Sequence, residues 1–488
     1  MSGPPRHVVL VGRDADLWLT ATALREALGP TGVAVTAIEL PTRLGPASAY
    51  ATLPAIESLH ARLGLDETAL LRTTGGSFSL GYNIVPHAGA PFFLAHGAYG
   101  APIDGSDFFA FWLKARRFGL AAGLEDFSPT AMAARHGRIL LPDEDTESFG
   151  RTDYAYHLPA IAYAAMLKSH ARRLGVVMHQ AVEIGVERDG NSGVVLAVRP
   201  DGGPPVAGDL FIDASGPDAV LVGGALGVAA DDWRPFFPFD RCLTAQGTGF
   251  ASVPGYADLR LSPSSWTALY ASQTATHVVH AYRAGDEDDE AAVAAATAAS
   301  GLALSDAAVA PIAPTIRTET WSGNCVAIGA SACAFDPLFD LHLHAVQLGI
   351  VHLLSLFPTT SAADAERSEY DRIMRSHFER LRDFQAALYL LSGGSLAAPE
   401  SLLHKLDTFR ARGTIAPMED ETFAPDQWRA LFVGLGVMPD SWPPAIDTTS
   451  PDRMKESFRR ILGFVSAKVL EQPTHDNCLA DLGGGGTA

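Results

Sequence analysis

The first forty residues constrain the fold of this chain more than any other segment. His7–Gly12 (HVVLVG) is a short run of mostly β-branched apolar residues closed by glycine, which is the pattern of a buried parallel strand. Leu17–Leu28 follows with apolar residues at helical spacing, and Val33–Leu40 returns to strand character. Together they predict a βαβ unit, whose right-handed crossover makes the two strands parallel neighbours.

Two later segments have the same form as the first strand. Asp209–Gly216 (DLFIDASG) and Cys325–Ala330 (CVAIGA) are apolar runs that end in small residues. They predict one sheet assembled from distant parts of the chain, with its strand ends meeting at a ligand site. Residues 76–105 and 238–285 are richer in aromatic, β-branched and turn residues, which predicts a second, more antiparallel layer that covers a substrate.

The pattern becomes helical from residue 341 onward. The sequence therefore predicts a domain of residues 1–340 that contains both sheets, followed by a helical C-terminal subdomain of residues 341–482. Residues 483–488 (GGGGTA) offer no side chain able to bury area, so we expect a disordered tail there.

The composition limits the kinds of binding partner and the cellular compartment that we expect for this protein. A formal charge of −19 argues against nucleic acid and anionic membranes, because both are polyanions. The four cysteines lie far apart without a C-x-x-C pair, so neither a disulfide framework nor a thiolate zinc site is predicted. The sequence has no signal-peptide pattern and no run of about 18 uninterrupted apolar residues. We expect a cytoplasmic protein with no membrane partner.

The order and spacing of these segments, and of several shorter stretches, resemble the flavin-dependent tryptophan halogenase family. The shorter stretches are ATLP (Ala51–Pro54), APIDGSDFFAFW (Ala101–Trp112), YAYH (Tyr154–His157), DR (Asp240–Arg241), NCVAIG (Asn324–Gly329), DPL (Asp336–Leu338) and PTH (Pro473–His475). The resemblance implies an α/β (α+β), Rossmann-like flavin monooxygenase fold of the box-and-pyramid type. It also implies bound FAD reduced by a separate reductase, hypohalous acid made at the flavin, and a lysine that relays the halogen to an aromatic substrate.

The family's dinucleotide loop, G-x-G-x-x-G, is largely replaced. Gly12 remains, but Asp14 and Leu17 stand at the second and third glycines. Asp16 adds a negative charge at a helix N-terminus, where phosphate normally binds, and Arg13 would offset part of the repulsion. One interpretation is that FAD no longer binds in its usual pose. The other is that the aspartates cap the helix of an ordinary Rossmann unit.

Other positions that the family uses for its cofactor are mixed. Glu39 ends the second strand where an acid would bind the adenosine ribose, whereas Tyr50 stands where the family has an acid. The further positions that match the family's cofactor site are Asp213, Gly216, Gly329 and Asp336. With Gly12 and Glu39, these residues are the vestiges of an FAD site, and we expect no cofactor to bind with normal affinity.

The residues that perform halogenation in the family are also replaced. Ser79, within GGSFSLG, takes the place of the relay lysine. A serine hydroxyl can neither form a chloramine nor carry a positive charge, so halogenation by the family's route should fail. A nucleophilic Ser79 is the alternative, but no G-x-S-x-G turn surrounds it, which favours an ordinary strand serine. Phe339 removes the family's glutamate, and Asp340 places a negative charge where halide should approach.

Four side chains near the start of the helical region are candidates for other chemistry. Asp336, Asp340, His342 and His344 lie close in sequence, and carboxylate and imidazole are suitable metal ligands. Asp340 and His344 would share one helical face, whereas His342 and His344 would diverge, which favours a helix start without metal. Asp340, His342 and His344, with Ser79, are the catalytic candidates.

Three residues match the substrate side of the family. His96, Trp266 and Phe339 predict an apolar, aromatic pocket that could hold an aromatic ligand, although Ala268 replaces the second of two family tryptophans. The alternative is that these rings simply pack into volume vacated by the flavin.

Three functions follow from these observations. The first is a non-halogenating relative, either a pseudoenzyme that forms a homo- or hetero-oligomer with an active sibling or a binding protein for an aromatic pathway intermediate. The second is an enzyme with altered chemistry on an aromatic substrate, flavin-dependent, metal-assisted or cofactor-free. The third is an active FAD-dependent halogenase with a displaced lysine.

Overall fold

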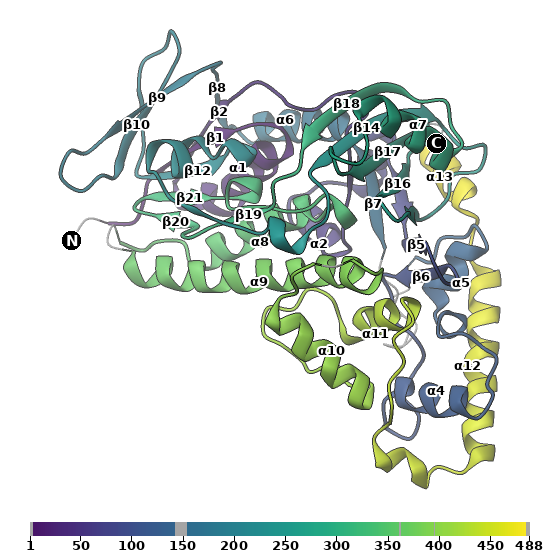
Figure 1. Ribbon diagram of the computed structural model, residues 1–488. Coiled ribbons are helices and arrows are strands. Elements are labelled where there is room, and N and C mark those ends of the chain that lie inside the picture. Colours follow the sequence, from purple (N-terminus) through teal and green to yellow (C-terminus); the bar gives the residue numbers. More distant parts are fainter. Residues whose placement is uncertain (1–2, 142–153, 361–362, 395, 485–488) are drawn as a thin grey trace. The chain divides into compact units, whose positions relative to one another are not determined.

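The computed structural model describes residues 3–141, 154–360, 363–394 and 396–484 (Figure 1). The chain divides into two compact units, each made of three separate stretches. Unit 1 is Met1–Thr74, Leu158–Phe237 and Pro311–Arg382, and unit 2 is Gly75–His157, Pro238–Ala310 and Asp383–Ala488. This differs from the expected boundary between residues 340 and 341. The reason is that parallel strands cannot be joined by tight turns, so unit 1 draws its strands from distant segments.

The predicted βαβ unit forms the centre of unit 1. β1 (His7–Gly12) pairs in parallel with β2 (Ala34–Glu39) on one side and β12 (Leu210–Ala214) on the other. α1 (Asp14–Leu28) makes the crossover between β1 and β2. Gly12 is required where β1 ends, because a Cβ there would lie 2.4 Å from the carbonyl oxygen of Ala214. The expectation of one sheet built from distant segments is confirmed.

The complete sheet of unit 1 has the order β20-β21-β12-β1-β2-β8, and α1 packs against α6 and α8. The other elements of unit 1 are β3 (Ala49–Ala51), α2 (Ala55–Arg62), α3 (Glu67–Thr74), α6 (Ala160–Arg173), β8 (Val177–Gln180), β9 (Ile184–Arg188), β10 (Val195–Pro200), β11 (Val206–Ala207), β13 (Ala230–Asp232), β19 (Thr315–Arg317), β20 (Trp321–Ser322), β21 (Cys325–Ala327), β22 (Cys333–Ala334), α8 (His342–Ser355) and the first part of α9 (Asp364–Leu391).

The stretch Leu338–Ser355, which contains α8, is by length and composition apolar enough to cross a membrane. It is nevertheless 56% buried inside the protein. Gly349 lets the helix approach Ile328 and Tyr370, which a Cβ at this position would contact at 3.3 Å. These contacts account for its hydrophobicity as that of a core helix.

Unit 2 contains a seven-stranded sheet in the order β18-β14-β17-β16-β15-β5-β6. β14 (Arg241–Thr248), β17 (Ala275–Tyr282), β16 (Ser265–Ala271) and β15 (Ala257–Leu261) pair antiparallel to one another. β5 (Gly81–Val85) then pairs in parallel with β15. The two aromatic-rich segments of the sequence thus contribute strands of one sheet.

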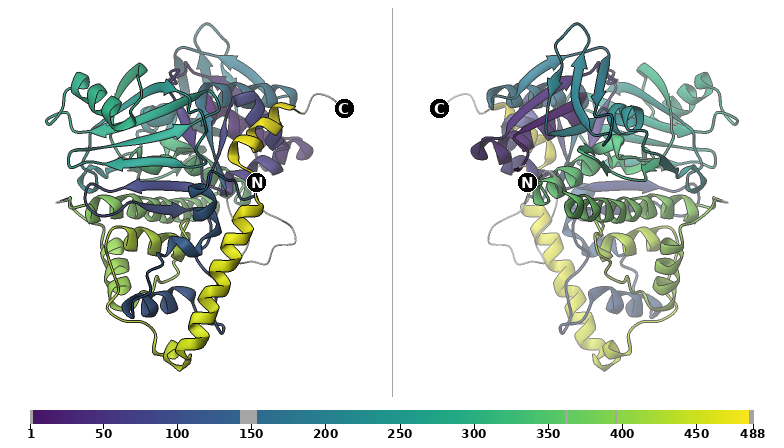
Figure 2. Two further views of the ribbon diagram at one scale, coloured as in Figure 1. Left: turned by 90° about the vertical axis from the view of Figure 1, so that its right-hand side faces the viewer. Right: turned by 90° about the vertical axis from the view of Figure 1, so that its left-hand side faces the viewer.

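The remaining elements of unit 2 are mostly helices, and α12 packs against α5 (Figure 2). They are β4 (Ser77–Ser79), β6 (Phe92–Ala95), α4 (Phe108–Arg117), α5 (Pro129–Arg135), β7 (Ala155–Pro159), α7 (Asp289–Ser300), β18 (Ser305–Pro311), α10 (Glu400–Arg412), α11 (Pro425–Gly434), α12 (Pro451–Glu471) and α13 (His475–Gly484). α13 includes Gly483 and Gly484, the first two residues of the expected disordered tail. Residues 485–488 lie outside the described part of the chain.

Candidate functional site

In the turn after β1, an aspartate has a backbone conformation that is typical of glycine. Asp14 has a left-handed conformation, with φ of 54°, which glycine adopts most easily and aspartate more easily than most other residues. Its carboxylate accepts hydrogen bonds from the hydroxyl of Thr42 (2.5 Å) and the backbone N–H of Arg43 (3.3 Å). No side chain caps the start of α1. The interpretation of these aspartates as helix caps is therefore wrong.

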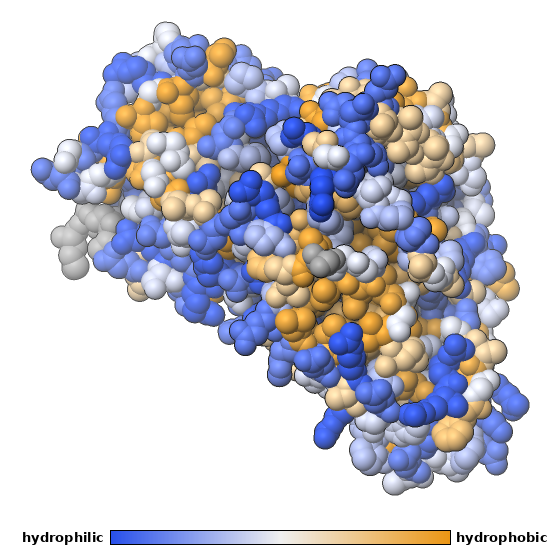
Figure 3. Space-filling model, viewed as in Figure 1, coloured by the Kyte–Doolittle hydropathy of each residue, from blue (hydrophilic) through white to orange (hydrophobic). Residues whose placement is uncertain are grey.

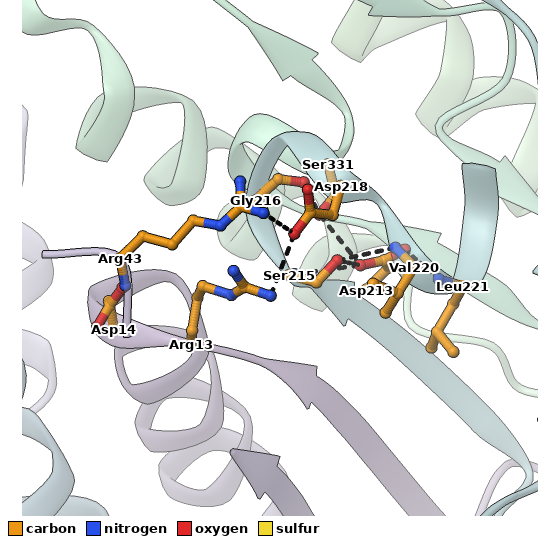
Figure 4. Close-up of polar contacts among 10 residues, drawn as sticks. All are labelled: Arg13, Asp14, Arg43, Asp213, Ser215, Gly216, Asp218, Val220, Leu221 and Ser331. Atoms are coloured by element: carbon orange, nitrogen blue, oxygen red, sulfur yellow. Dashed lines mark hydrogen bonds and ion pairs between the residues drawn. The ribbon is translucent and has the colours of Figure 1, made fainter. Parts of the chain in front are cut away.

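Arg13 and Arg43 both pair with Asp218 (Figure 4). The guanidinium of Arg13 lies 3.3 Å from the Asp218 carboxylate. Asp218, which no sequence pattern indicated, is thus the shared ion-pair partner of both arginines and neutralises one of their two positive charges.

Asp213 is fully buried at the end of β12 and holds the loop that follows. One oxygen accepts hydrogen bonds from Ser215 N (3.1 Å), Ser215 Oγ (2.6 Å) and Ser331 Oγ (3.1 Å). The other accepts from the backbone N–H groups of Leu221 (2.7 Å; Figure 4) and Val222 (2.9 Å). The carbonyl of Gly216 accepts from the same Ser331 hydroxyl at 3.0 Å. This predicted cofactor residue is thus fully engaged by its own chain.

Glu39 ends β2 as predicted, but its carboxylate already has partners. Lys168 Nζ donates to it at 2.5 Å, Gln180 Nε2 at 3.1 Å and Trp18 Nε1 at 3.3 Å. Glu39, Lys168 and Gln180 line a cleft of about 390 Å³. A ribose hydroxyl entering this cleft would compete with a lysine for the acid.

Four residues from separate parts of the predicted site come together in unit 1. They are Asp16, Tyr50, Asp340 and His342, which we call the Asp16 cluster. His342 Nε2 lies 2.6 Å from Asp16 Oδ1, and the Tyr50 ring stacks on the imidazole with centroids 5.8 Å apart. Asp340 accepts a hydrogen bond from the backbone N–H of Ala51 at 2.6 Å. The sequence placed these residues in three separate motifs, and only the fold makes them neighbours.

Gly329 explains why the Asp16 carboxylate fits in this cluster. A Cβ at Gly329 would lie 2.5 Å from Asp16 Oδ2, and the backbone there has a φ of +65°. The carboxylate therefore occupies the space beside a glycine that matches the family's cofactor site.

The charges of the cluster shift the protonation of its members. Burial by itself lowers the pKa of His342, but the carboxylates of Asp16 and Asp340 outweigh it and raise the pKa to about 9. Burial raises the pKa of Asp340 to about 6, although the Ala51 N–H and His342 oppose the shift. Burial and then Asp16 raise the pKa of the Tyr50 phenol. At neutral pH His342 is therefore a cation held by Asp16.

This arrangement predicts a stability that falls as pH rises. The pKa of His342 is about 9 in the folded protein and about 6.5 in the unfolded chain. The contribution of His342 to the free energy of unfolding is therefore complete below about pH 6.5, and it is lost as pH rises through about 9. Asp340 acts in the same direction at lower pH, because its raised pKa penalises the ionised carboxylate in the folded state. His342 is 32% exposed, so we expect a loss of only about 1–2 kcal/mol.

Thermal unfolding followed by circular dichroism between about pH 6 and pH 10 would measure this loss. His342→Gln should flatten the upper part of the profile, whereas Asp340→Asn should leave that part in place. Identical profiles for the wild type and His342→Gln would contradict the assignment.

The predicted cluster of two aspartates and two histidines does not form a metal site. Phe339 and Asp340 have left-handed backbones, with φ of 63° and 45°, and α8 begins only at His342. Asp340 and His344 therefore do not share a helical face, and that prediction is wrong. Asp336 accepts a hydrogen bond from Leu338 N, and burial lowers the pKa of His344 to about 4. In the described residues no three His, Cys, Asp or Glu side chains are arranged to hold a metal ion.

Ser79 lies in β4 and is 3% exposed. Its hydroxyl donates to the carbonyl oxygen of Gly81 at 3.4 Å, and β4 pairs with β7, with Ser79 opposite Ala155. Among the described residues no histidine or carboxylate hydrogen-bonds to this hydroxyl. It thus has neither the charge of a halogen-relay lysine nor the base of a nucleophilic serine.

Of the three predicted substrate residues, Trp266 and His96 lie in unit 2 and Phe339 in unit 1. Trp266, on β16, lines a cleft of about 460 Å³ in unit 2, and neither His96 nor Phe339 is among the described residues of that cleft. His96 is buried against the edge of Tyr82, and burial lowers its pKa to about 3. Phe339 is buried in unit 1.

Sequence reasoning missed three partners that decide the state of the site residues. Lys168 pairs with Glu39 from 129 positions away, and Asp218 pairs with Arg43 from 175 positions away. Tyr389 accepts a hydrogen bond from Trp266 across 123 positions. None of the three lies in a motif, so no local signal could have found them.

Comparison with known proteins confirms the resemblance found in the sequence. A family model described as tryptophan halogenase matches residues 7–451. A tryptophan 6-halogenase of Streptomyces toxytricini is 24% identical, with 98% of each chain covered. The solved structure of BrvH, a flavin-dependent halogenase from Brevundimonas sp. BAL3, has a TM-score of 0.92 at 28% identity and covers 98% of this chain and 99% of its own.

A second solved structure, a flavin-dependent halogenase from Xanthomonas campestris, has a TM-score of 0.93 at 26% identity and covers 98% of both chains. These matches extend over nearly the whole chain and confirm the Rossmann-like α/β fold class. This chain belongs to the tryptophan halogenase family, a family of flavin-dependent proteins.

Proposed function

We propose that this chain is a non-halogenating member of its family that binds an aromatic small molecule. The observation that carries the proposal is Ser79, a buried strand serine whose hydroxyl is bonded to the neighbouring carbonyl of Gly81. The family's route needs an amine at this position, and a hydroxyl cannot supply one.

The turn after β1 adds a second argument, because its residues do not fit the diphosphate of FAD. A diphosphate at the start of α1 would meet the carboxylate of Asp14, whereas the carboxylate of Asp16 is paired with His342. A like charge at about 5 Å costs on the order of 3 kcal/mol at an effective dielectric constant of about 20. Arg13 and Arg43 share the one carboxylate of Asp218, which neutralises one of their two positive charges, and the Arg43 side chain is 55% exposed, so solvent and salt screen its charge. Glu39 is likewise engaged by Lys168.

The proposal places the protein in a reducing cytoplasm with a small-molecule ligand. All four cysteines are free thiols. The net charge of −19 opposes nucleic acid as an alternative partner.

The test is the flavin content and the turnover of the purified protein. We expect no stoichiometric flavin absorbance after purification, and no halogenated product when FAD, a flavin reductase, chloride or bromide, and tryptophan or indole are supplied. An active halogenase of the same family serves as the positive control. A yellow protein with one flavin per chain, or any halogenated product, would contradict the proposal.

A lysine variant separates the two arguments. Ser79→Lys restores the relay side chain but leaves Asp14 and Asp16 in place, so we expect it to remain inactive. Halogenation by this single variant would show that FAD binds and that only the relay is missing. Product formed without added flavin would instead favour altered chemistry, and Asp340→Asn and His342→Gln would then test whether the Asp16 cluster performs it.

A further inference from the structure

The cleft that contains Trp266 is built by the sheet of unit 2 and by the C-terminal end of α9. Its volume of about 460 Å³ lies within the usual range of small-molecule sites. The described residues that line it are His87, Pro238, Phe239, Leu261–Trp266, Arg283, Asp286, Leu388, Tyr389, Ser392, Gly393, Gly394 and Leu396. Hydrophobic side chains gather on the surface around this end of α9 (Figure 3). The cleft therefore combines an apolar wall with charged groups.

Three aromatic rings form one corner of the cleft. Trp266 Nε1 donates a hydrogen bond to the Tyr389 hydroxyl at 2.8 Å, with Trp266 1% and Tyr389 5% exposed. Phe239 is half-buried and meets Tyr389 edge to face, with centroids 5.8 Å apart and planes at 74°. The buried hydrogen bond fixes both rings, so the wall is already formed before a ligand arrives. A preformed aromatic corner favours a flat aromatic ligand, which can stack on it or meet it edge to face.

Arg283 supplies the charge of the cleft. Its Nε and Nη2 atoms both donate to the carbonyl oxygen of Pro238, at 3.1 and 2.9 Å. These bonds hold the guanidinium by one edge and leave the Nη1–Nη2 edge with two donors. No carboxylate of the described residues pairs with Arg283. An arginine fixed in this way is suited to bind a carboxylate through two parallel hydrogen bonds.

Asp286 is the one carboxylate among the described lining residues of the cleft. It lies in the turn after β17, where its backbone N–H donates to the carbonyl of Arg283 at 3.0 Å. Its side chain is exposed, so solvent and salt screen its repulsion of an anion. Arg283 is exposed as well, so the desolvated part of the cleft is the aromatic corner of Trp266 and Tyr389, and the guanidinium lies at its solvent-facing side.

We infer that this cleft binds a planar aromatic carboxylate, with the ring against Trp266 and Phe239 and the carboxylate on Arg283. The inference rests on the proposed function in taking the chain as a binding protein, and it adds the class of ligand. Neither Ser79 nor any residue of the Asp16 cluster is among the described residues that line the cleft.

Isothermal titration calorimetry of the full-length protein with 2-naphthoate tests this inference. We expect saturable binding of one 2-naphthoate per chain. We also expect binding at least tenfold weaker for the uncharged 2-naphthalenemethanol and for acetate, because each lacks one of the two recognised groups. No binding of 2-naphthoate up to about 1 mM, or equal binding of the uncharged analogue, would overturn the inference.

Two variants test whether the ligand binds in this cleft. Arg283→Gln should weaken 2-naphthoate binding about tenfold or more, the loss of one charge-assisted contact. Trp266→Leu should weaken both naphthalene compounds. Arg459→Gln, which removes an exposed arginine of α12, is the matched control and should change nothing, with circular dichroism confirming the fold of each variant. Unchanged affinity in a folded Arg283→Gln protein would also overturn the inference. Flavin content and halogenation do not enter these titrations, so failure here leaves the proposed lack of halogenation standing.

Discussion

Asp213→Ala should lower the free energy of unfolding by about 3–5 kcal/mol. The carboxylate is completely buried and accepts five hydrogen bonds, two of them from the backbone N–H groups of Leu221 and Val222. Alanine would leave these donors buried without an acceptor and open space between β12 and the following loop. Urea unfolding followed by circular dichroism measures the loss.

Asp218→Ala is the matched control for this experiment. Asp218 lies in the same loop and also bonds to charged groups, but its side chain is 33% exposed. We expect a loss below about 1 kcal/mol, since exposed ion pairs contribute little. Equal losses for the two variants would mean that the buried hydrogen bonds of Asp213 do not hold the loop. Asp213→Asn, which retains one acceptor oxygen, should fall between them.

The second large effect is expected at the ion pair of the Asp16 cluster. His342→Leu removes the cation and leaves the Asp16 carboxylate, which is 5% exposed, without its partner. Breaking a buried pair from one side is strongly destabilising because an uncompensated charge stays buried. Since His342 itself is partly exposed, we expect a loss of about 2–4 kcal/mol in the free energy of unfolding.

The double variant Asp16→Leu with His342→Leu distinguishes lost attraction from buried charge. It removes both charges and should be more stable than His342→Leu alone by about 1 kcal/mol or more, as when apolar residues replace both members of a buried pair. Comparison of the wild type, the single variants Asp16→Leu and His342→Leu, and the double variant by denaturant unfolding gives the coupling energy. A coupling energy near zero would show that the two side chains do not interact in solution.

Local patterns were sufficient to predict the central elements of the sheet in unit 1. The run HVVLVG and the helical spacing of Leu17–Leu28 predicted β1 and α1, because a buried parallel strand and an amphipathic helix leave different periods in the sequence. DLFIDASG and CVAIGA predicted β12 and β21 for the same reason. The boundary at residue 340 failed, since a compact unit is defined by long-range contacts that leave no period.

The candidate site was predicted less completely than the fold. Ser79, Asp14 and Leu17 could be recognised as replacements because each stands inside a family motif. The prediction of a shared face for Asp340 and His344 failed because two successive left-handed residues, Phe339 and Asp340, separate the turn from α8. Such a backbone is strained for residues other than glycine and is stable only where surrounding contacts enforce it.

The sequence by itself determined which chemical groups this protein has and which it lacks. It established an aspartate in the dinucleotide loop, a serine at the relay position and a glutamate at the end of the second strand. Only the tertiary structure decided what those groups do, because their charges depend on partners that lie more than a hundred positions away. Lys168 forms an ion pair with Glu39, and His342 forms one with Asp16. Asp218 pairs with both Arg13 and Arg43. Coulomb interactions and hydrogen bonds act through space over a few ångströms, and the fold alone sets those distances.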